Sequence, residues 1–377
     1  MVRIKCTEDF EELGATIKVV GLGGAGGNAI NRMVEAGVKG VELIAANTDS
    51  QVLSLTKGDV RIQLGESISK GLGVGMDPAK GRLAAQESKE SLREVLTGAD
   101  MVFITTGMGG GTGTGAAPVA AQIARECNAL TVGVVTRPFN FEGRDRAAKA
   151  EAGIKELREY VDSLLVIPND KLLDPDATTK EAYRRADDVL RQSVQAITDV
   201  ITNSGNINMD MADIKAIMTN AGEALMGVGE ATGPHRAEEA ARFAIESPLL
   251  ENVTIDGAKG LIVNVVARSA DDLRIQEVDD IMALIGPAMS HDAKMKVGNA
   301  FDPLLEDRLR VTVIATGFPA SGRHRHSRAF GRLTRGGAPV GTYGPSLVDE
   351  VSPTAARPDA NDWSKPAFLR RKVRKLR

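Results

Sequence analysis

The chain carries the stretch Gly107-Met108-Gly109-Gly110-Gly111-Thr112-Gly113-Thr114-Gly115, in which six of nine residues are glycine. The apolar segment Met101–Thr106 before it predicts a buried strand, and Ala116–Cys127 after it predicts a helix. The glycines therefore fall where backbone amides and a helix dipole face an anion, and glycine lets the anion approach the backbone closely. Each charge-assisted hydrogen bond contributes about 1.5 to 3 kcal/mol, so several amides together hold a di- or triphosphate. The stretch predicts a phosphate-binding loop rather than a flexible linker.

A second glycine turn lies near the start of the sequence. The apolar strand Ile17–Val20 leads into Gly21-Leu22-Gly23-Gly24-Ala25-Gly26-Gly27-Asn28, and a helical pattern follows to about Ala36. Its Gly-x-Gly-x-x-Gly spacing alone is typical of NAD-dependent dehydrogenases, which remain an alternative. Two glycine loops instead indicate a triphosphate held from two sides, and no pattern suggests a hydride-transfer site. The sequence contains no Gly-Lys-Ser/Thr, which excludes P-loop nucleotide hydrolases.

Composition and charge narrow the class of protein. The chain has 377 residues, 42% of them hydrophobic, enough for a large core and two or three domains. We expect a soluble, cytoplasmic protein, because no signal pattern and no apolar run of about 18 residues occurs. Two cysteines and four histidines give neither a disulfide framework nor zinc-binding spacing. Residues 319–377 hold 13 Lys/Arg and 4 Asp/Glu, against 34 and 46 elsewhere, so the acidic body disfavours nucleic acid while the basic tail suits acidic partners.

Strands and helices alternate over the first half of the sequence. Besides Ile17–Val20, strands are predicted at Glu42–Ala46, Met101–Thr106, Leu130–Thr136 and Ser163–Pro168. This alternation predicts an α/β fold, with a doubly wound parallel sheet that binds ligands at the carboxyl ends of its strands.

A long helix, Lys180–Thr202, leads from this region to a second one, where we expect a smaller α+β domain. Its helices are predicted at Asp213–Ala221, Arg236–Glu246 and Gln276–Ile285, and its strands at Leu225–Glu230, Leu261–Val266, Lys294–Ala300 and Leu309–Thr316. Low apolar content beyond Phe318 predicts a disordered linker. The expected parts are a nucleotide-binding α/β domain (1–179), a central helix (180–205), a C-terminal α+β domain (206–318), a disordered linker (319–361) and a C-terminal peptide (362–377).

The sequence GGGTGTG at residues 109–115, flanked in this way, resembles the signature of the tubulin and FtsZ superfamily of polymer-forming GTPases. The resemblance is closer to the FtsZ family of bacterial cell division than to tubulin, and it extends from Thr16 to Phe318. It implies that the chain binds GTP and GDP and hydrolyses GTP. It also implies Mg²⁺ held mainly by the phosphates and water, with no metal-binding residue assigned.

The resemblance assigns residues to each part of the nucleotide. The glycine loops offer the phosphates Gly23, Gly24, Gly110, Gly111, Thr112 and Gly113. A carboxylate accepts two hydrogen bonds from the N1–H and N2–H2 edge of guanine, although composition alone allows Asp187 to be an ordinary solvated helix residue. The family pattern places Tyr183, Asp187 and Asn28 near guanine, Glu142 and Arg146 against ribose or phosphate, Asn169 beside the sugar, and Asn47-Thr48-Asp49 near the γ-phosphate and Mg²⁺.

A second candidate site is the segment Asn208-Met209-Asp210-Met211-Ala212-Asp213, before a predicted helix. Taken alone, Asn and Asp here are typical of helix caps. The segment also resembles the family's catalytic loop, which completes the nucleotide site of a neighbouring subunit. The resemblance implies that Asn208, Asp210 and Asp213 are catalytic and that subunits join head to tail into a filament. A GTP-binding filament scaffold without significant turnover is the alternative.

The final stretch, Asp362-Trp363-Ser364-Lys365-Pro366-Ala367-Phe368-Leu369-Arg370-Arg371, resembles the FtsZ peptide that binds membrane tethers and regulatory division proteins. We expect residues 362–377 to bind such proteins, so that contact with the membrane is indirect. Leu369, Val373 and Leu376 share one helical face among six basic residues, so weak binding to anionic lipid is an alternative. The resemblance implies a cytoplasmic ring at mid-cell beneath the membrane, and a plasmid-partitioning relative remains another possibility.

Overall fold

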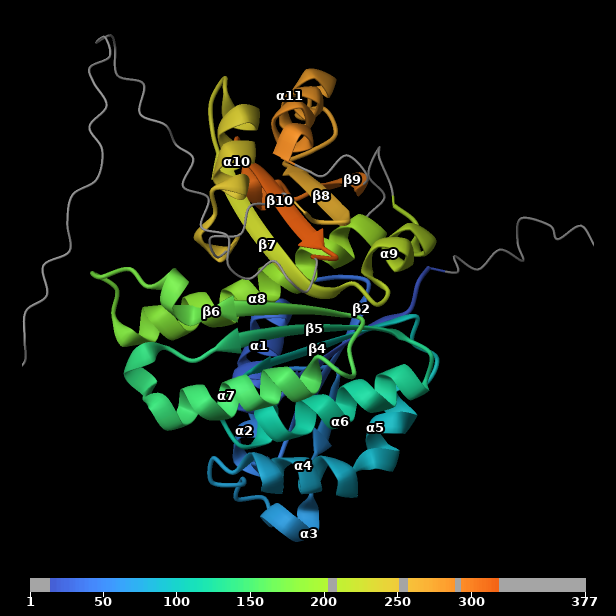
Figure 1. The fold of residues 1–377 in the computed structure, drawn as a ribbon, viewed down its shortest axis with the longest axis vertical. Coiled ribbons are helices and arrows are strands. Elements are labelled where there is room, and N and C mark those ends of the chain that lie inside the picture. The colour runs from blue at the N-terminus through green and yellow to red at the C-terminus, as the bar shows by residue number, and fades with distance from the viewer. Residues whose placement is uncertain (1–13, 203–208, 251–256, 289–292, 319–377) are drawn as a thin grey trace, which may run out of the picture. The chain divides into compact units, whose positions relative to one another are not determined.

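The computed structural model describes residues 14–202, 209–250, 257–288 and 293–318 (Figure 1). The expected linker 319–361, the C-terminal peptide 362–377 and Asn208 lie outside these residues. The predicted α/β architecture is confirmed for the described part of the chain.

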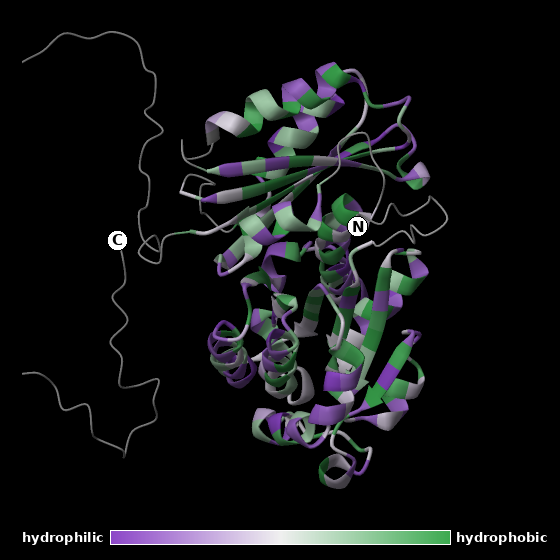
Figure 2. Cartoon of the chain, turned by 90° about the vertical axis from the view of Figure 1, so that its right-hand side faces the viewer, coloured by the Kyte–Doolittle hydropathy of each residue, from purple (hydrophilic) through white to green (hydrophobic). Residues whose placement is uncertain are grey.

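The described strands form one ten-stranded sheet in the order β3-β2-β1-β4-β5-β6-β7-β10-β8-β9. Its first six strands are parallel: β1 (Ile17–Leu22), β2 (Val41–Asn47), β3 (Val60–Gln63), β4 (Met101–Gly107), β5 (Leu130–Arg137) and β6 (Ser163–Pro168). Parallel strands are covered on both faces, so these read as nearly continuous apolar runs. Figure 2 shows them as mostly hydrophobic ribbons between helices of mixed hydropathy.

Helices cover both faces of the parallel strands. They are α1 (Gly23–Glu35), α2 (Ser50–Ser54), α3 (Glu66–Ser69), α4 (Pro78–Glu87), α5 (Lys89–Leu96), α6 (Thr112–Glu126), α7 (Arg144–Leu157) and α8 (Thr179–Thr202). The side chains of β1 are divided between the two faces of the sheet, as expected for a strand. Val20 and Leu22 pack in the core that contains α4 to α7, whereas Ile17 and Val19 pack in the core that contains α1 and α8. The doubly wound arrangement follows from this two-sided burial.

The second region continues the same sheet with a different strand pattern. It contains α9 (Met211–Met218), β7 (Gly222–Ala231), α10 (Arg236–Ile245), β8 (Gly260–Ala267), α11 (Ile275–Ile285), β9 (Lys294–Phe301) and β10 (Leu309–Thr316). Strand β10 is antiparallel to β7 and β8, while β9 is parallel to β8. A separate apolar core lies between these strands and helices α10 and α11. The predicted α+β domain is therefore present. Three residue pairs between β6 and β7, from Ser163–Gly222 to Leu165–Ala224, join its strands to the first six strands of the sheet.

Several boundaries differ from those predicted. The helix expected at Asp213–Ala221 begins at Met211 and ends at Met218, because the Asp210 side chain caps its first turn. Strand β3 was not predicted, since its four residues are too few to show a period. Short 3₁₀ turns occupy Asn140–Glu142, Asn169–Leu172, Pro248–Leu250, Gly286–Ala288 and Pro303–Leu305.

Helix α8 matches the predicted central helix and has 24 residues, which correspond to a length of about 36 Å. It packs between the two regions, and its Ala196 carbonyl accepts a 3.1 Å hydrogen bond from Nδ2 of Asn264 on β8. Among the described residues, no helix is both long and apolar enough to cross a membrane.

Candidate functional site

The two glycine turns lie side by side where β1 and β4 end. These strands are parallel neighbours; helix α1 begins at Gly23, directly after β1, and helix α6 begins at Thr112, after a loop of residues 108–111 that follows β4. A methyl group added to Gly23 would lie 3.0 Å from the amide nitrogen of Gly113. The first-turn amides of a helix have no partner within the helix, and the helix dipole is positive there. Two such ends in one place form a binding site for a multiply charged anion.

The glycines of the two loops meet different physical requirements. Gly23 and Gly109 have φ angles of 68° and 96°, in the left-handed region that favours glycine. A methyl group at Gly113 would collide with the hydroxyl of Thr106, so this glycine serves packing. At Gly24 or Gly110, in contrast, a methyl group would meet no atom of the described residues within 4 Å. The fold does not require these two positions to be bare, which suits a ligand that contacts the backbone there.

Threonine hydroxyls tie the loops together. Thr106 donates a 2.8 Å hydrogen bond to the carbonyl of Leu22, and Thr114 accepts one of 2.8 Å from the amide of Gly109. The hydroxyls of Thr48 and Thr112 lie 2.6 Å apart. Thr48 therefore brings the loop after β2 to the start of α6, whereas Asp49 in the same loop caps α2. The expected γ-phosphate loop thus reaches the glycine loops through Thr48.

Asn28 on α1 and Asp187 on α8 face each other at one end of this region. Burial raises the pKa of Asp187 to about 7, although the positive charge of Arg32 and a hydrogen bond from Asn28 both lower it. A carboxyl group that titrates near neutrality beside an anion site is a candidate for ligand recognition. The structure thus brings together two of the three residues that were expected at guanine.

An aromatic cluster lies beside Asp187. Phe139 stacks on Phe141 with ring centroids 4.9 Å apart, and Tyr183 meets the edge of Phe139 at 5.4 Å. The pKa of Tyr183 is raised by burial and by the nearby charge of Glu142, to which its hydroxyl is hydrogen-bonded. Sequence reasoning missed the two phenylalanines. Their proximity to Glu142 in a chain with only 3% aromatic residues was the available signal.

The remaining nucleotide candidates lie near this cluster and the glycine loops. Glu142 accepts a 2.8 Å hydrogen bond from the amide of Phe139 and pairs with Arg146 at 2.6 Å. A methyl group on Gly109 would touch the side chain and carbonyl of Arg146, so the arginine adjoins the phosphate loop. Asn169 is buried, and its Oδ1 has no hydrogen-bond partner among the described residues. An unpaired buried acceptor calls for a donor such as a hydroxyl of a bound ligand.

The acidic segment before α9 lies elsewhere. Asp210 accepts a 2.7 Å hydrogen bond from the amide of Asp213, the helix-cap contact that its residue type favours. The end of α9 adjoins the amino end of β6, where Ser163 donates a 2.7 Å hydrogen bond to the carbonyl of Met218. The nucleotide candidates instead lie at the carboxyl ends of the strands. Along α8 the distance from Tyr183 to Thr202 is about 29 Å. Met209, just before Asp210, lies with Val200 around Gly298, so this segment is at the far end of α8 from Tyr183.

The donor set at the glycine loops fits a magnesium ion held by its ligand. Among the described residues, no group of three or more His, Cys, Asp or Glu side chains is placed to bind a metal. Asp49 and Asp77 adjoin the loops, but both carboxylates cap helices. Mg²⁺ often uses substrate phosphates and water for most of its ligands.

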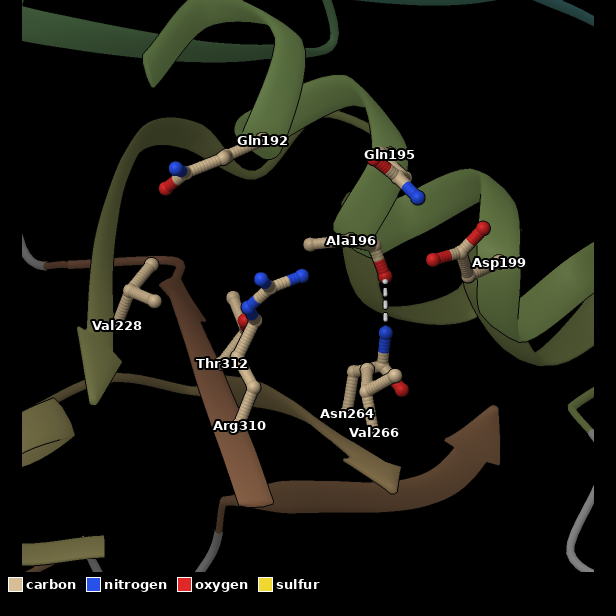
Figure 3. Close-up of a pocket in the computed structure, with 9 residues that line it drawn as sticks. All are labelled: Gln192, Gln195, Ala196, Asp199, Val228, Asn264, Val266, Arg310 and Thr312. Carbon is tan, nitrogen blue, oxygen red and sulfur yellow. Dashed lines mark hydrogen bonds between the residues drawn. The ribbon is translucent and has the colours of Figure 1, made fainter. Parts of the chain in front are cut away.

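A small cavity lies on another side of α8, between that helix and strands β7, β8 and β10 (Figure 3). Its lining includes Gln192, Asp199, Asn264 and Arg310. Burial raises the pKa of Asp199 to about 6. None of the residues expected to bind nucleotide lines this cavity, which follows the seam between α8 and the C-terminal strands.

Comparison with known proteins agrees with this arrangement. The family model described as "Tubulin/FtsZ family, GTPase domain" matches residues 16–175, and "FtsZ family, C-terminal domain" matches residues 222–319. The structure is similar to an FtsZ dimer from M. jannaschii, with 43% sequence identity, a TM-score of 0.79, and coverage of 81% of this chain and 89% of that one. A tryptophan-to-tyrosine mutant of FtsZ from M. jannaschii gives 43% identity, a TM-score of 0.78, and 81% and 92% coverage.

A more distant protein shares the fold alone. CetZ2 from Haloferax volcanii matches with 18% identity, a TM-score of 0.70, and coverage of 82% of this chain and 95% of that one. The two family models and the 43% identity over most of the M. jannaschii protein are the findings that assign the family. The chain therefore belongs to the FtsZ family of the tubulin/FtsZ group, whose members are filament-forming GTPases.

Proposed function

We propose that this GTPase hydrolyses GTP at a site shared by adjacent subunits of a head-to-tail filament. The observation that carries the proposal is the separation of the two half-sites. The glycine loops lie at the carboxyl ends of the strands, whereas α9, which Asp210 caps, ends beside the amino end of β6. Between these regions α8 spans about 29 Å from Tyr183 to Thr202. Two complementary patches at opposite ends of one molecule produce a heterologous contact that repeats without closing. The similarity to an FtsZ dimer supports self-association.

In the proposed site, the glycine loops bind and orient the nucleotide. Amides at Gly23, Gly24 and 110–113 point at the phosphates, and the Thr48 and Thr112 hydroxyls lie beside them. Tyr183, Asp187 and Asn28 take the guanine, Glu142 and Arg146 the ribose or phosphate, and Asn169 the sugar. A Mg²⁺ ion held by the nucleotide phosphates and water would supply positive charge at the phosphate oxygens. The amides stabilise the charge that develops as the γ-phosphate leaves.

The neighbouring subunit supplies Asp210 and Asp213, which orient the attacking water, and we assign Asn208 to the same loop. Phosphoryl transfer depends mainly on positioning and charge stabilisation, so no covalent nucleophile is needed. We further propose that the filaments form a bacterial division ring in the cytoplasm at mid-cell. Residues 362–377 would bind membrane tethers and division regulators there. The likeness of residues 362–371 to the FtsZ peptide that binds membrane tethers supports this role.

Phosphate release from GTP with Mg²⁺, measured across protein concentrations alongside light scattering and with ATP as the control nucleotide, tests the shared site. We expect turnover and scattering to appear above the same threshold concentration. Asp213→Ala should lower turnover about 100-fold and change GTP affinity less than twofold. Asp279→Ala, an exposed carboxylate on α11, is the matched control and should change neither.

Two results would contradict the proposal. Turnover proportional to concentration from zero, without scattering, means a site contained within one subunit. Normal turnover by Asp213→Ala means that this loop is not catalytic. Filaments of the unmodified chain that bind GTP without releasing phosphate indicate the scaffold alternative.

A further inference from the structure

Lys296 contacts the segment that carries Asp210 and Asp213. Its Nζ lies 2.6 Å from Oδ1 of Asp213, and the two side chains are 43% and 32% exposed. Lys296 belongs to β9, the last strand of the sheet order, whereas Asp213 lies in the first turn of α9. The ion pair therefore joins two elements that are distant in the sequence.

The strand places Lys296 there by alternation. Residues two apart on a strand share a face, so Lys296 lies on the same face as Gly298. A methyl group on Gly298 would be 2.6 Å from Cγ1 of Val200 and 3.2 Å from Cε of Met209. This face of β9 thus packs against the end of α8 and the residues that lead into α9. Lys296 extends from the packed part of the strand to the first turn of α9.

The contacts around Asp213 fix both its backbone and its side chain. Asp210 holds the amide of Asp213 at 2.7 Å, and Lys296 holds Oδ1. The Oδ2 atom is the carboxylate oxygen that neither contact uses, so it is the one available to a water molecule. A carboxylate near a triphosphate is repelled by its charge and tends to swing away. A cation fixed beside Oδ1 opposes this movement.

We propose that Lys296 is a positioning residue for GTP hydrolysis, which holds Asp213 oriented so that Oδ2 faces the attacking water at the neighbouring subunit's γ-phosphate. The inference rests on the proposed function, because it requires Asp213 to act on a neighbour's nucleotide. Lys296 acts through Asp213 and does not itself contact the substrate.

The test separates turnover from assembly. Phosphate release and pelleted protein are measured over a concentration series, which gives turnover per assembled subunit and the critical concentration. Lys296→Met should lower turnover per assembled subunit about fivefold, the factor typical of a partly exposed ion pair, with the critical concentration within about twofold. Lys296→Arg keeps the charge and should restore at least about half of the turnover. Lys294→Met removes the same charge from the same strand face two residues away and should have little effect.

A mixing experiment covers the case in which Lys296→Met does not assemble alone. Trace Lys296→Met or unmodified subunits are copolymerised into excess Asp213→Ala subunits, where only the trace subunits supply an intact Asp213. The Lys296→Met trace should give about fivefold less phosphate than the unmodified trace.

Three results would overturn the inference: equal turnover in Lys296→Met and the unmodified chain, an effect confined to the critical concentration, or an equal loss in Lys294→Met. If Asp213→Ala itself retains full turnover, the shared site fails as well. If Asp213→Ala is inactive and Lys296→Met is normal, only the role of Lys296 fails.

Discussion

The two halves of the sheet build their polar sites from different parts of the chain. In the parallel half, the proposed anion site consists mainly of backbone amides at Gly23, Gly24 and 110–113, where every residue except Thr112 is glycine. In the C-terminal half, the polar contacts come from charged side chains, in the Asp213–Lys296 pair and in a network around Arg236. The difference teaches that nucleotide affinity and folding stability can be changed separately in this molecule.

The largest expected effect is on the C-terminal half. Arg236 is buried and bonds both carboxylate oxygens of Glu277, at 2.7 and 3.2 Å, together with Asp272 at 3.2 Å. Burial raises the pKa of Glu277, but hydrogen bonds from the Arg236 side chain and the Arg274 amide, with the charges of both arginines, together outweigh it, so the pKa lies below the usual value. Removing one partner leaves a buried charge without compensation. Arg236→Ala should lower the free energy of unfolding by about 3 kcal/mol in a urea titration and leave the GTP affinity of the folded protein unchanged.

Arg268→Ala is the matched control for this prediction. Arg268 pairs with the same Asp272 and with Asp307, but at 3.7 Å and with a half-exposed side chain. Its loss should cost less than about 1 kcal/mol. Equal destabilisation by the two substitutions would mean that burial of Arg236 is not what matters. A change in GTP affinity would mean that the halves are coupled.

In the parallel half we expect the opposite result, a loss of GTP affinity without a loss of stability. A methyl group at Gly110 meets open space in the described structure, so Gly110→Ala should fold with an unchanged melting temperature. The added methyl group would lie where we propose that the phosphates bind. GTP affinity should therefore fall about 30-fold, which corresponds to the loss of about two hydrogen bonds. Calorimetric titration with GTP and thermal melting measure the two quantities on the same sample.

Gly113→Ala provides the contrast within the same loop. Its methyl group would displace the Thr106 hydroxyl, which is buried and bonded to the Leu22 carbonyl. Overpacking and a broken buried hydrogen bond should together lower stability by about 2 kcal/mol. If Gly110→Ala binds GTP as tightly as the unmodified chain, the phosphates do not bind at this loop. If Gly110→Ala has a lower melting temperature, the fold requires glycine at position 110.

These contrasts also show what the sequence reveals and what it hides. The glycine loops and the helix Lys180–Thr202 were predictable because their signals are local: residues close in the sequence set the turn and the helical period. The cap at Asp210 is local too, and residue type alone indicated it. Strand β3 was missed because four residues at a sheet edge show no period.

Contacts between distant segments were not readable from residue patterns. Family resemblance brought Asn28 and Asp187 together, and their contact depends on α1 packing against α8. The packing of Phe139 and Phe141 against Tyr183, and the approach of Lys296 to Asp213, come from tertiary structure alone. The pKa of Asp187 likewise depends on how deeply packing buries a helix residue that composition would leave in solvent.

The smallest expected effect is a pH dependence of GTP affinity in the parallel half. It comes from one carboxyl group, because backbone amides do not change their charge with pH. Guanine offers two N–H donors, so Asp187 must be ionised to accept both, while burial raises its pKa to about 7. Because the raised pKa keeps the free protein protonated at lower pH, binding must release a proton there. GTP affinity should therefore be about tenfold weaker at pH 6 than at pH 8. Calorimetric titrations at pH 6, 7 and 8 measure it.

The variant Asp187→Asn separates the pH dependence that comes from Asp187 from the pH dependence that comes from protonation of GTP. The second contribution is the same for both proteins. The amide presents one acceptor and a donor at every pH, so its affinity should be weaker at pH 8 and should lack the component that belongs to Asp187. If the two proteins show the same pH dependence, Asp187 does not bind the guanine edge in its ionised form. A steeper dependence in the unmodified chain would instead mean that the ionised Asp187 carboxylate takes part in recognition of the base.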